Sequence, residues 1–134
     1  MSSPSTWTAV SPTQRAGQAA EDLALDYLLS HGLRLVARNW RVPLGEVDLV
    51  MRDGAQLVFV EVRRRGRGDF GGAAASVGWA KQARLRRTAS AFLAARYGDR
   101  AWPAVRFDVV AIEGAGSAGA RVGGAGLDWI RAAF

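Results

Sequence analysis

The chain has no cysteine, one histidine and one lysine among its 134 residues. Without cysteine, neither a disulfide nor a thiolate-bound zinc site can form. No run of about 18 apolar residues is present, so we expect no membrane-spanning helix. The first residues, MSSPSTWTAVSP, lack the basic start and apolar run of a secretory signal, and we therefore expect a cytoplasmic protein.

Positive charge and apolar residues are abundant instead. The net charge is +6 and the isoelectric point is about 11.2, which favours a polyanionic partner, nucleic acid first. Of the 18 basic residues 17 are arginine, and the many Ala and Gly residues indicate a GC-rich coding bias, so part of the arginine excess carries no functional meaning. The hydrophobic fraction of 49% predicts a folded single domain over residues 11–134, after a disordered tail at 1–10.

Residue patterns predict an α/β fold. The first helix has Ser11 as its N-cap, Pro12 at its first position, Gln14 completing a capping box, and Gly32 as its stop. The expected elements are a helix over 11–30, a strand over 33–41, a β-hairpin over 44–65, a helix over 76–97, a strand over 104–113 and a short edge strand over 127–130. This α-β-β-β-α-β-β order implies a mixed β-sheet of four to five strands flanked by helices, with the fourth strand parallel to a neighbour.

The hairpin over 44–65, LGEVDLVMRDGAQLVFVEVRRR, is the feature around which the chain is organised. Asp53-Gly54 between two apolar-rich runs predicts a two-residue type I′ turn, and a turn of this length sets the register of the strands. Arg52 would then pair with Ala55.

One face of this hairpin carries charge where strands rarely do. In the predicted register Glu46 lies opposite Glu61, and Asp48 is a diagonal neighbour of Glu61. Arg63 shares their face because side chains alternate along a strand. Converging carboxylates repel unless a cation lies between them, and their oxygens suit Mg²⁺ or Mn²⁺; the alternative is a solvated face whose acids pair with arginines. The opposite face carries the apolar residues Val47, Leu49, Val58, Val60 and Val62.

Two further acids lie outside the hairpin, and Glu21 is expected to point toward the core. Glu21 lies on the helical line of Ala24 and Leu28, and an inward glutamate requires either a metal or an ion pair with an arginine at the edge of the core. Asp108 alternates with Arg106 on one face of the fourth strand, and we expect a structural ion pair or hydrogen-bond acceptor there.

Basic residues cluster on the loop GRGDFGG (66–72), on the arginines that precede it, and on one side of the second helix. A glycine-rich basic loop can lie along a phosphate backbone, and a basic helix face can do the same. The alternatives are a flexible connection and a solvated helix face. The residues predicted to contact nucleic acid are Arg63, Arg64, Arg65, Arg67, Lys81, Arg84 and Arg87.

Several segments together resemble a known family. They are GQAAEDLALDYL (17–28), GEVDLV (45–50), VFVEVR (58–63), FGGAAASV (70–77), KQARL (81–85) and RFDVV (106–110). The chain is similar to the YraN family of predicted endonucleases, related to archaeal Holliday junction resolvases, and the resemblance spans about residues 15–131. It implies the restriction-endonuclease-like core of the PD-(D/E)XK nucleases.

The resemblance also implies roles for individual residues. Asp48 and Glu61 correspond to the metal ligands. Glu21 corresponds to the additional helix carboxylate of the resolvase-like members, which would bind the metal through water or position a second ion. Arg63 stands where this nuclease core normally has lysine, and arginine stays protonated, so it can act only as a charged donor. Lys81, the only lysine, is a candidate substitute for the missing amine.

The function that follows is Mg²⁺- or Mn²⁺-dependent hydrolysis of phosphodiester bonds in DNA, selective for branched or junction structures. Resolvase relatives are dimers, which implies a homodimer by analogy only. Two alternatives stay open: a nucleic-acid-binding module with the same fold and no chemistry, and a protein-assembly factor whose basic charge is only compositional.

Overall fold

The computed structural model describes residues 11–65, 77–113 and 126–134. The predicted tail at 1–10, the loop at 66–72 that contains Arg67, and nearly all of the predicted loop at 114–126 lie outside these ranges. The elements are α1 (Pro12–Ser30), β1 (Arg34–Val42), β2 (Gly45–Asp53), β3 (Gln56–Arg65), α2 (Trp79–Tyr97), β4 (Val105–Glu113) and β5 (Leu127–Ile130). The predicted element order is confirmed.

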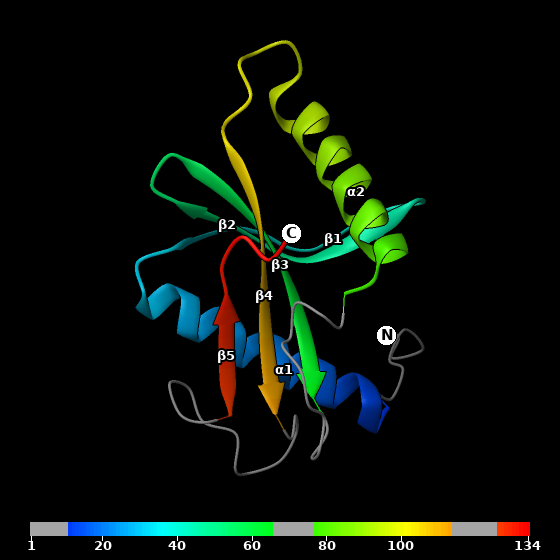
Figure 1. Ribbon diagram of the computed structural model, residues 1–134, viewed down its shortest axis with the longest axis vertical. Helices are drawn as coiled ribbons and strands as arrows, with labels where there is room; N and C mark the ends of the chain where they lie inside the picture. Colours follow the sequence, from blue (N-terminus) through cyan, green and yellow to red (C-terminus); the bar gives the residue numbers. More distant parts are fainter. Residues whose placement is uncertain (1–10, 66–76, 114–125) are drawn as a thin grey trace, which may run out of the picture.

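The five strands form one mixed sheet in the order β1-β2-β3-β4-β5. All neighbours are antiparallel except β3 and β4, which run parallel from Leu57↔Val105 to Arg65↔Glu113. The chain between these two strands contains α2, as parallel strands require a crossover connection. The α/β class with a mixed, helix-flanked sheet is therefore confirmed, and α1 and α2 lie on opposite sides of the sheet (Figure 1).

The first helix begins and ends where its sequence predicts. The Ser11 hydroxyl accepts a hydrogen bond from the Gln14 backbone at 3.1 Å, and the Gln14 side chain accepts one from the Ser11 backbone at 3.0 Å. This capping box satisfies two amides that the first helical turn leaves free. At the other end His31 is the C-cap and Gly32 has φ +90°, a conformation that glycine adopts without strain.

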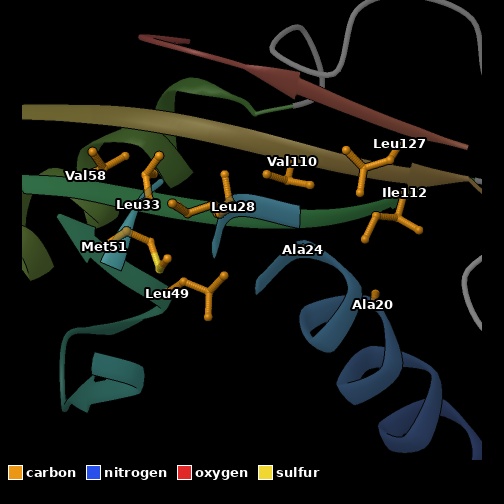
Figure 2. Packing of buried hydrophobic residues seen from close by; sticks show 11 residues of the cluster. Ala20, Ala24, Leu28, Leu33, Leu49, Met51, Val58, Val110, Ile112 and Leu127 are labelled. Atoms are coloured by element: carbon orange, nitrogen blue, oxygen red, sulfur yellow. The ribbon is translucent and has the colours of Figure 1, made fainter. Parts of the chain in front are cut away.

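The helix α1 buries a stripe of small and branched side chains against the sheet (Figure 2). Ala20, Ala24 and Leu28 are at most 1% exposed. They pack against residues from four strands: Leu49, Met51, Val58, Val60, Val110, Ile112 and Leu127. Removing a side chain such as Leu28 from this layer would cost about 2–5 kcal/mol of stability. Neither helix in the described ranges is long and apolar enough to cross a membrane.

The predicted hairpin register is wrong by two residues, because Arg52 was expected to pair with Ala55 and pairs with Leu57. Asp53 pairs with Gln56 and Arg52 with Leu57, so the turn consists of Gly54 and Ala55. Of these two, only Gly54 has positive φ, at +61°, which is the requirement of a type II′ turn and not of the predicted type I′ turn. A shift of two residues does not by itself turn any side chain to the other face, because side chains alternate with a period of two.

The alternation of faces along β2 reverses near Asp48. Leu49 packs under α1, but Val47 belongs to the cluster under α2, so its predicted place beside Leu49 is wrong. On the neighbouring strand Asn39 has φ +52°, in the left-handed region that extended strands avoid. The pairing of β1 with β2 omits Asn39 and resumes at Trp40↔Val47. We attribute the reversal of faces to this local twist.

The predicted place of Glu46 opposite Glu61 is also wrong. Glu46 pairs with Arg41 across β1 and β2, and their side chains form an ion pair at 2.9 Å. Both side chains are more than half exposed. Arg41 neutralises Glu46 at the surface, so Glu46 is not part of the cluster that contains Asp48 and Glu61.

Candidate carboxylate site at the end of the β2–β3 pairing

Asp48 and Glu61 face each other where β2 and β3 separate. The backbone pairing of these strands ends at Leu49↔Val60, so the next opposed positions are Asp48 and Glu61. The Val62 amide donates a hydrogen bond to Asp48 Oδ2 at 2.8 Å. A side-chain oxygen thus replaces a backbone carbonyl as the acceptor at this point of the ladder. By this register Asp48 and Glu61 occupy the first opposed positions beyond the pairing, where the sequence predicted a diagonal arrangement.

The environment of Asp48 disfavours its charged form and raises its pKa. Burial, together with the negative charges of Glu61 and Glu21, raises the pKa of Asp48 from 3.8 to about 7. The hydrogen bond from the Val62 amide and the charge of Lys81 act in the opposite direction. Three acids from α1, β2 and β3 therefore influence one another electrostatically.

Lys81 provides the nearest positive charge to Glu61. Its Nζ lies 2.6 Å from Glu61 Oε2, whereas Arg63 Nη1 lies 3.9 Å from the same oxygen. Glu61 is only 6% exposed, so it would be costly to leave it without a partner. The first turn of α2 brings the only lysine of the chain onto the carboxylate that the sequence marks as a metal ligand.

Glu21 reaches the edge of the core from α1 with an incomplete set of partners. Its side chain is 17% exposed, and Oε1 is buried without a hydrogen-bond partner. Arg38 Nε lies 3.6 Å from that oxygen, an ion-pair distance, while Arg38 Nη2 donates a hydrogen bond to Asp22. The sequence reasoning did not single out Arg38; its only signal was its place on the strand that follows the helix.

These residues fit a divalent cation by their chemistry. The donor set consists of carboxylate oxygens, the ligands that Mg²⁺ and Mn²⁺ prefer. The raised pKa of Asp48 indicates a local shortage of positive charge, and Oε1 of Glu21 is a buried acceptor without a hydrogen-bond donor. As they stand, however, no three acidic or histidine side chains in the described parts of the chain are grouped closely enough to hold one ion. A cation at Asp48 and Glu61 would compete with Lys81 for Glu61 Oε2.

Of the residues predicted to contact nucleic acid, Arg64 and Arg65 of β3 are poorly placed to do so beside Glu61, whereas two arginines of α2 are exposed. Arg65 is committed to an ion pair with Asp128 of β5 at 2.8 Å. Arg64 is exposed, but alternation along β3 turns it to the α1 side of the sheet, away from Glu61. Arg84 and Arg87 are exposed on α2.

Asp108 has the structural role expected from sequence. It is completely buried and accepts hydrogen bonds from Arg106 Nε at 3.0 Å, from the Trp129 indole at 2.9 Å and from the Ala132 amide at 2.9 Å. Arg106 also contacts Asp53 at 2.9 Å, so the pair connects β4 to the β2–β3 turn. A carboxylate with this many donors needs no metal.

The mixed five-stranded sheet flanked by two helices is consistent with the restriction-endonuclease-like class of α/β folds. Within that class, the chain belongs to the uncharacterised protein family UPF0102, whose family model matches residues 20–112. This confirms the resemblance to the YraN family, which is the same family. The matched range contains Glu21, Asp48, Glu61 and Lys81.

Bacterial relatives agree with this membership. The chain is 56% identical over 106 residues to a UPF0102 protein of Bordetella parapertussis, covering 77% of this chain and 60% of that protein. It is 54% identical over 127 residues to a UPF0102 protein of Bordetella petrii, covering 92% of this chain and 72% of the relative. A UPF0102 protein of Pseudomonas entomophila is 50% identical over 121 residues, covering 89% and 92%. The names of these relatives state the family and no activity.

Proposed function

We propose that this chain is a metal-dependent endonuclease that hydrolyses phosphodiester bonds in DNA, with selectivity for branched or junction structures. The observation that carries the proposal is the position of Asp48 and Glu61 at the end of the β2–β3 pairing, where the negative charge of Glu61 acts on the buried Asp48. The raised pKa of Asp48 supports it, because a carboxylate that is costly to ionise gains most from a nearby cation.

Each residue at the site has a chemical task in this proposal. A divalent cation held by Asp48 and Glu61 would lower the pKa of a water and offset charge on the phosphate. Oε1 of Glu21, which has an ion pair with Arg38 but no hydrogen-bond partner, can accept a hydrogen bond from the attacking water and orient it. Lys81, once it leaves Glu61, can donate to a phosphate oxygen, and Arg63 adds a fixed positive charge.

The exposed arginines of α2 would bind the DNA backbone. Arg84 and Arg87 are exposed on a helix that contains no acidic residue. Contacts between arginine and phosphate carry no sequence information, so selectivity must come from the shape of the DNA.

The proposal is tested by incubating the protein with branched and linear DNA in Mg²⁺ or Mn²⁺. Asp48→Ala and Glu61→Ala should each abolish cleavage. Glu46→Ala is the matched control, because it removes an exposed acid of the same hairpin that is paired with Arg41. Cleavage that survives both site substitutions would come from a contaminating nuclease and would overturn the proposal.

A second candidate is a nucleic-acid-binding module without catalytic activity. The observation that favours it is the Lys81–Glu61 ion pair at 2.6 Å, which occupies a predicted metal ligand, together with arginine at position 63. Salt-dependent DNA binding with no cleavage in any divalent cation would support this module. Weak DNA binding that does not depend on salt would instead favour a protein-assembly factor.

A further inference from the structure

Trp79, the first residue of α2, exposes its indole ring to solvent. Its side chain is 85% exposed. The other large hydrophobic residues exposed in the described ranges, Leu29, Leu35, Leu44 and Trp102, are 43–47% exposed. Trp79 follows the N-cap Gly78 and belongs to none of the hydrophobic clusters of the described residues. It therefore adds little to the folded core, and its exposure requires another explanation.

Trp79 lies in the same helical turn as Lys81, which contacts the candidate carboxylate site. It precedes Lys81 by two residues in the same helical turn, which is about 3 Å along the helix axis. The ammonium group of Lys81 contacts Glu61 at 2.6 Å. Trp79 is thus close to the carboxylate site along the axis of α2, and helical spacing turns its side chain to the other side of the helix from Lys81.

The charge around Trp79 favours a polyanion. The helix α2 contains five basic residues and no acidic one; the basic residues are Lys81, Arg84, Arg86, Arg87 and Arg96. Helical spacing places Arg86 and Arg87 on the same side as Trp79, because they follow it by seven and eight residues. Arg87 then lies about 12 Å from Trp79 along the axis. A flat aromatic ring beside a basic surface is the arrangement that binds unpaired nucleotides, with stacking on the ring and ion pairs to the backbone.

We propose that Trp79 stacks on an unpaired base of a nucleic acid whose backbone follows the basic side of α2. The inference rests on the proposed function, since it takes the partner of the site to be DNA. Bases within a continuous duplex are stacked on their neighbours and offer no free face, whereas a branch, flap or gap exposes one. Trp79 is then the residue that selects branched DNA, and the arginines bind any backbone.

The test is a binding measurement in a chelator, so that no cleavage occurs. Labelled duplex with a single-stranded flap and a long blunt duplex of matched length are titrated with wild-type protein and with Trp79→Ala, Trp79→Phe and Trp102→Ala. Trp102→Ala is the matched control, because Trp102 is also exposed but follows the C-terminal end of α2, where its indole donates to the Gly98 carbonyl at 3.0 Å. Circular dichroism verifies the fold of each variant.

Trp79→Ala should weaken binding of the flap DNA about 5- to 100-fold and leave binding of blunt duplex within about twofold. Trp79→Phe should retain most of the flap affinity, and Trp102→Ala should match wild type. Equal losses on both DNAs, or no loss on either, would overturn the inference. Wild-type protein that binds both DNAs equally well would overturn it too.

The outcome is independent of the cleavage assay. Flap-selective binding that depends on Trp79, without cleavage in Mg²⁺ or Mn²⁺, would leave this inference intact and refute the nuclease. Cleavage of branched DNA that requires Asp48 and Glu61 but is unchanged by Trp79→Ala would support the nuclease and refute the role of Trp79.

Discussion

Replacing Asp48 by asparagine should stabilise the metal-free protein at neutral and alkaline pH. The asparagine oxygen can still accept the hydrogen bond that the Val62 amide donates at 2.8 Å, so the local geometry is kept. What the substitution removes is the charge of a carboxylate that is buried and faces Glu61. Loss of a candidate metal ligand would thus increase stability, as expected where a functional site is arranged for a ligand and not for the free protein.

The magnitude follows from the pKa of Asp48, which is raised from 3.8 to about 7. Between these values the folded state binds more protons at this position than the unfolded state, so stability falls as pH rises through the window. Below about pH 4 both states are protonated and the penalty vanishes; above about pH 7 it is complete. A shift of about three pKa units corresponds to about 4 kcal/mol, and coupling to Glu61 leaves an expected gain of about 2–4 kcal/mol for Asp48→Asn.

The assay is urea unfolding in a chelator, from about pH 5 to about pH 8. The stability difference between Asp48→Asn and wild type should grow with pH across this range. Glu46→Gln, in the exposed pair with Arg41, should change stability by less than about 1 kcal/mol. Added Mn²⁺ should stabilise wild type more than Asp48→Asn. If Asp48→Asn is no more stable than wild type at about pH 8, the carboxylate is not strained and the reasoning fails.

Three further substitutions test the remaining contacts. Lys81→Met leaves Glu61 with only Arg63 at 3.9 Å, and should lower the unfolding free energy in chelator by about 1–3 kcal/mol, with recovery in Mn²⁺; an unchanged stability would contradict this. Arg63→Lys should raise the rate of DNA cleavage if arginine has weakened the site, whereas an equal or lower rate would give Arg63 a role of its own. Asp108→Ala should cost about 3–5 kcal/mol in urea unfolding because it leaves Arg106 half-buried and short of a partner, and a loss below about 1 kcal/mol would show that the network adapts.

Local signals were sufficient to predict most of the fold. The capping box at Ser11 and Gln14 is a contact between residues three apart, so it is encoded in a few neighbouring positions. The parallel pairing of β3 with β4 followed from the helix between them, since chain connectivity allows few other arrangements. The edge strand Leu127–Ile130 was predicted with its observed bounds.

The geometry of the site depended on features that sequence patterns do not resolve. The turn is formed by Gly54 and Ala55 and not by Asp53 and Gly54, and the resulting register places Asp48 opposite Glu61 and not diagonal to it. The side chains change faces near Asn39, which we attribute to the left-handed backbone conformation of this one residue. The contact of Lys81 with Glu61 depends on how α2 packs on the sheet, which no local pattern specifies.

The most direct test of the account is an anomalous difference map from crystals soaked in Mn²⁺. The account predicts a peak between the carboxylates of Asp48 and Glu61, with the ammonium of Lys81 moved away from Glu61 Oε2. A map without a peak at these acids, with Lys81 still in contact with Glu61 at high Mn²⁺ concentration, would contradict the central claim that this hairpin is built to hold a catalytic cation.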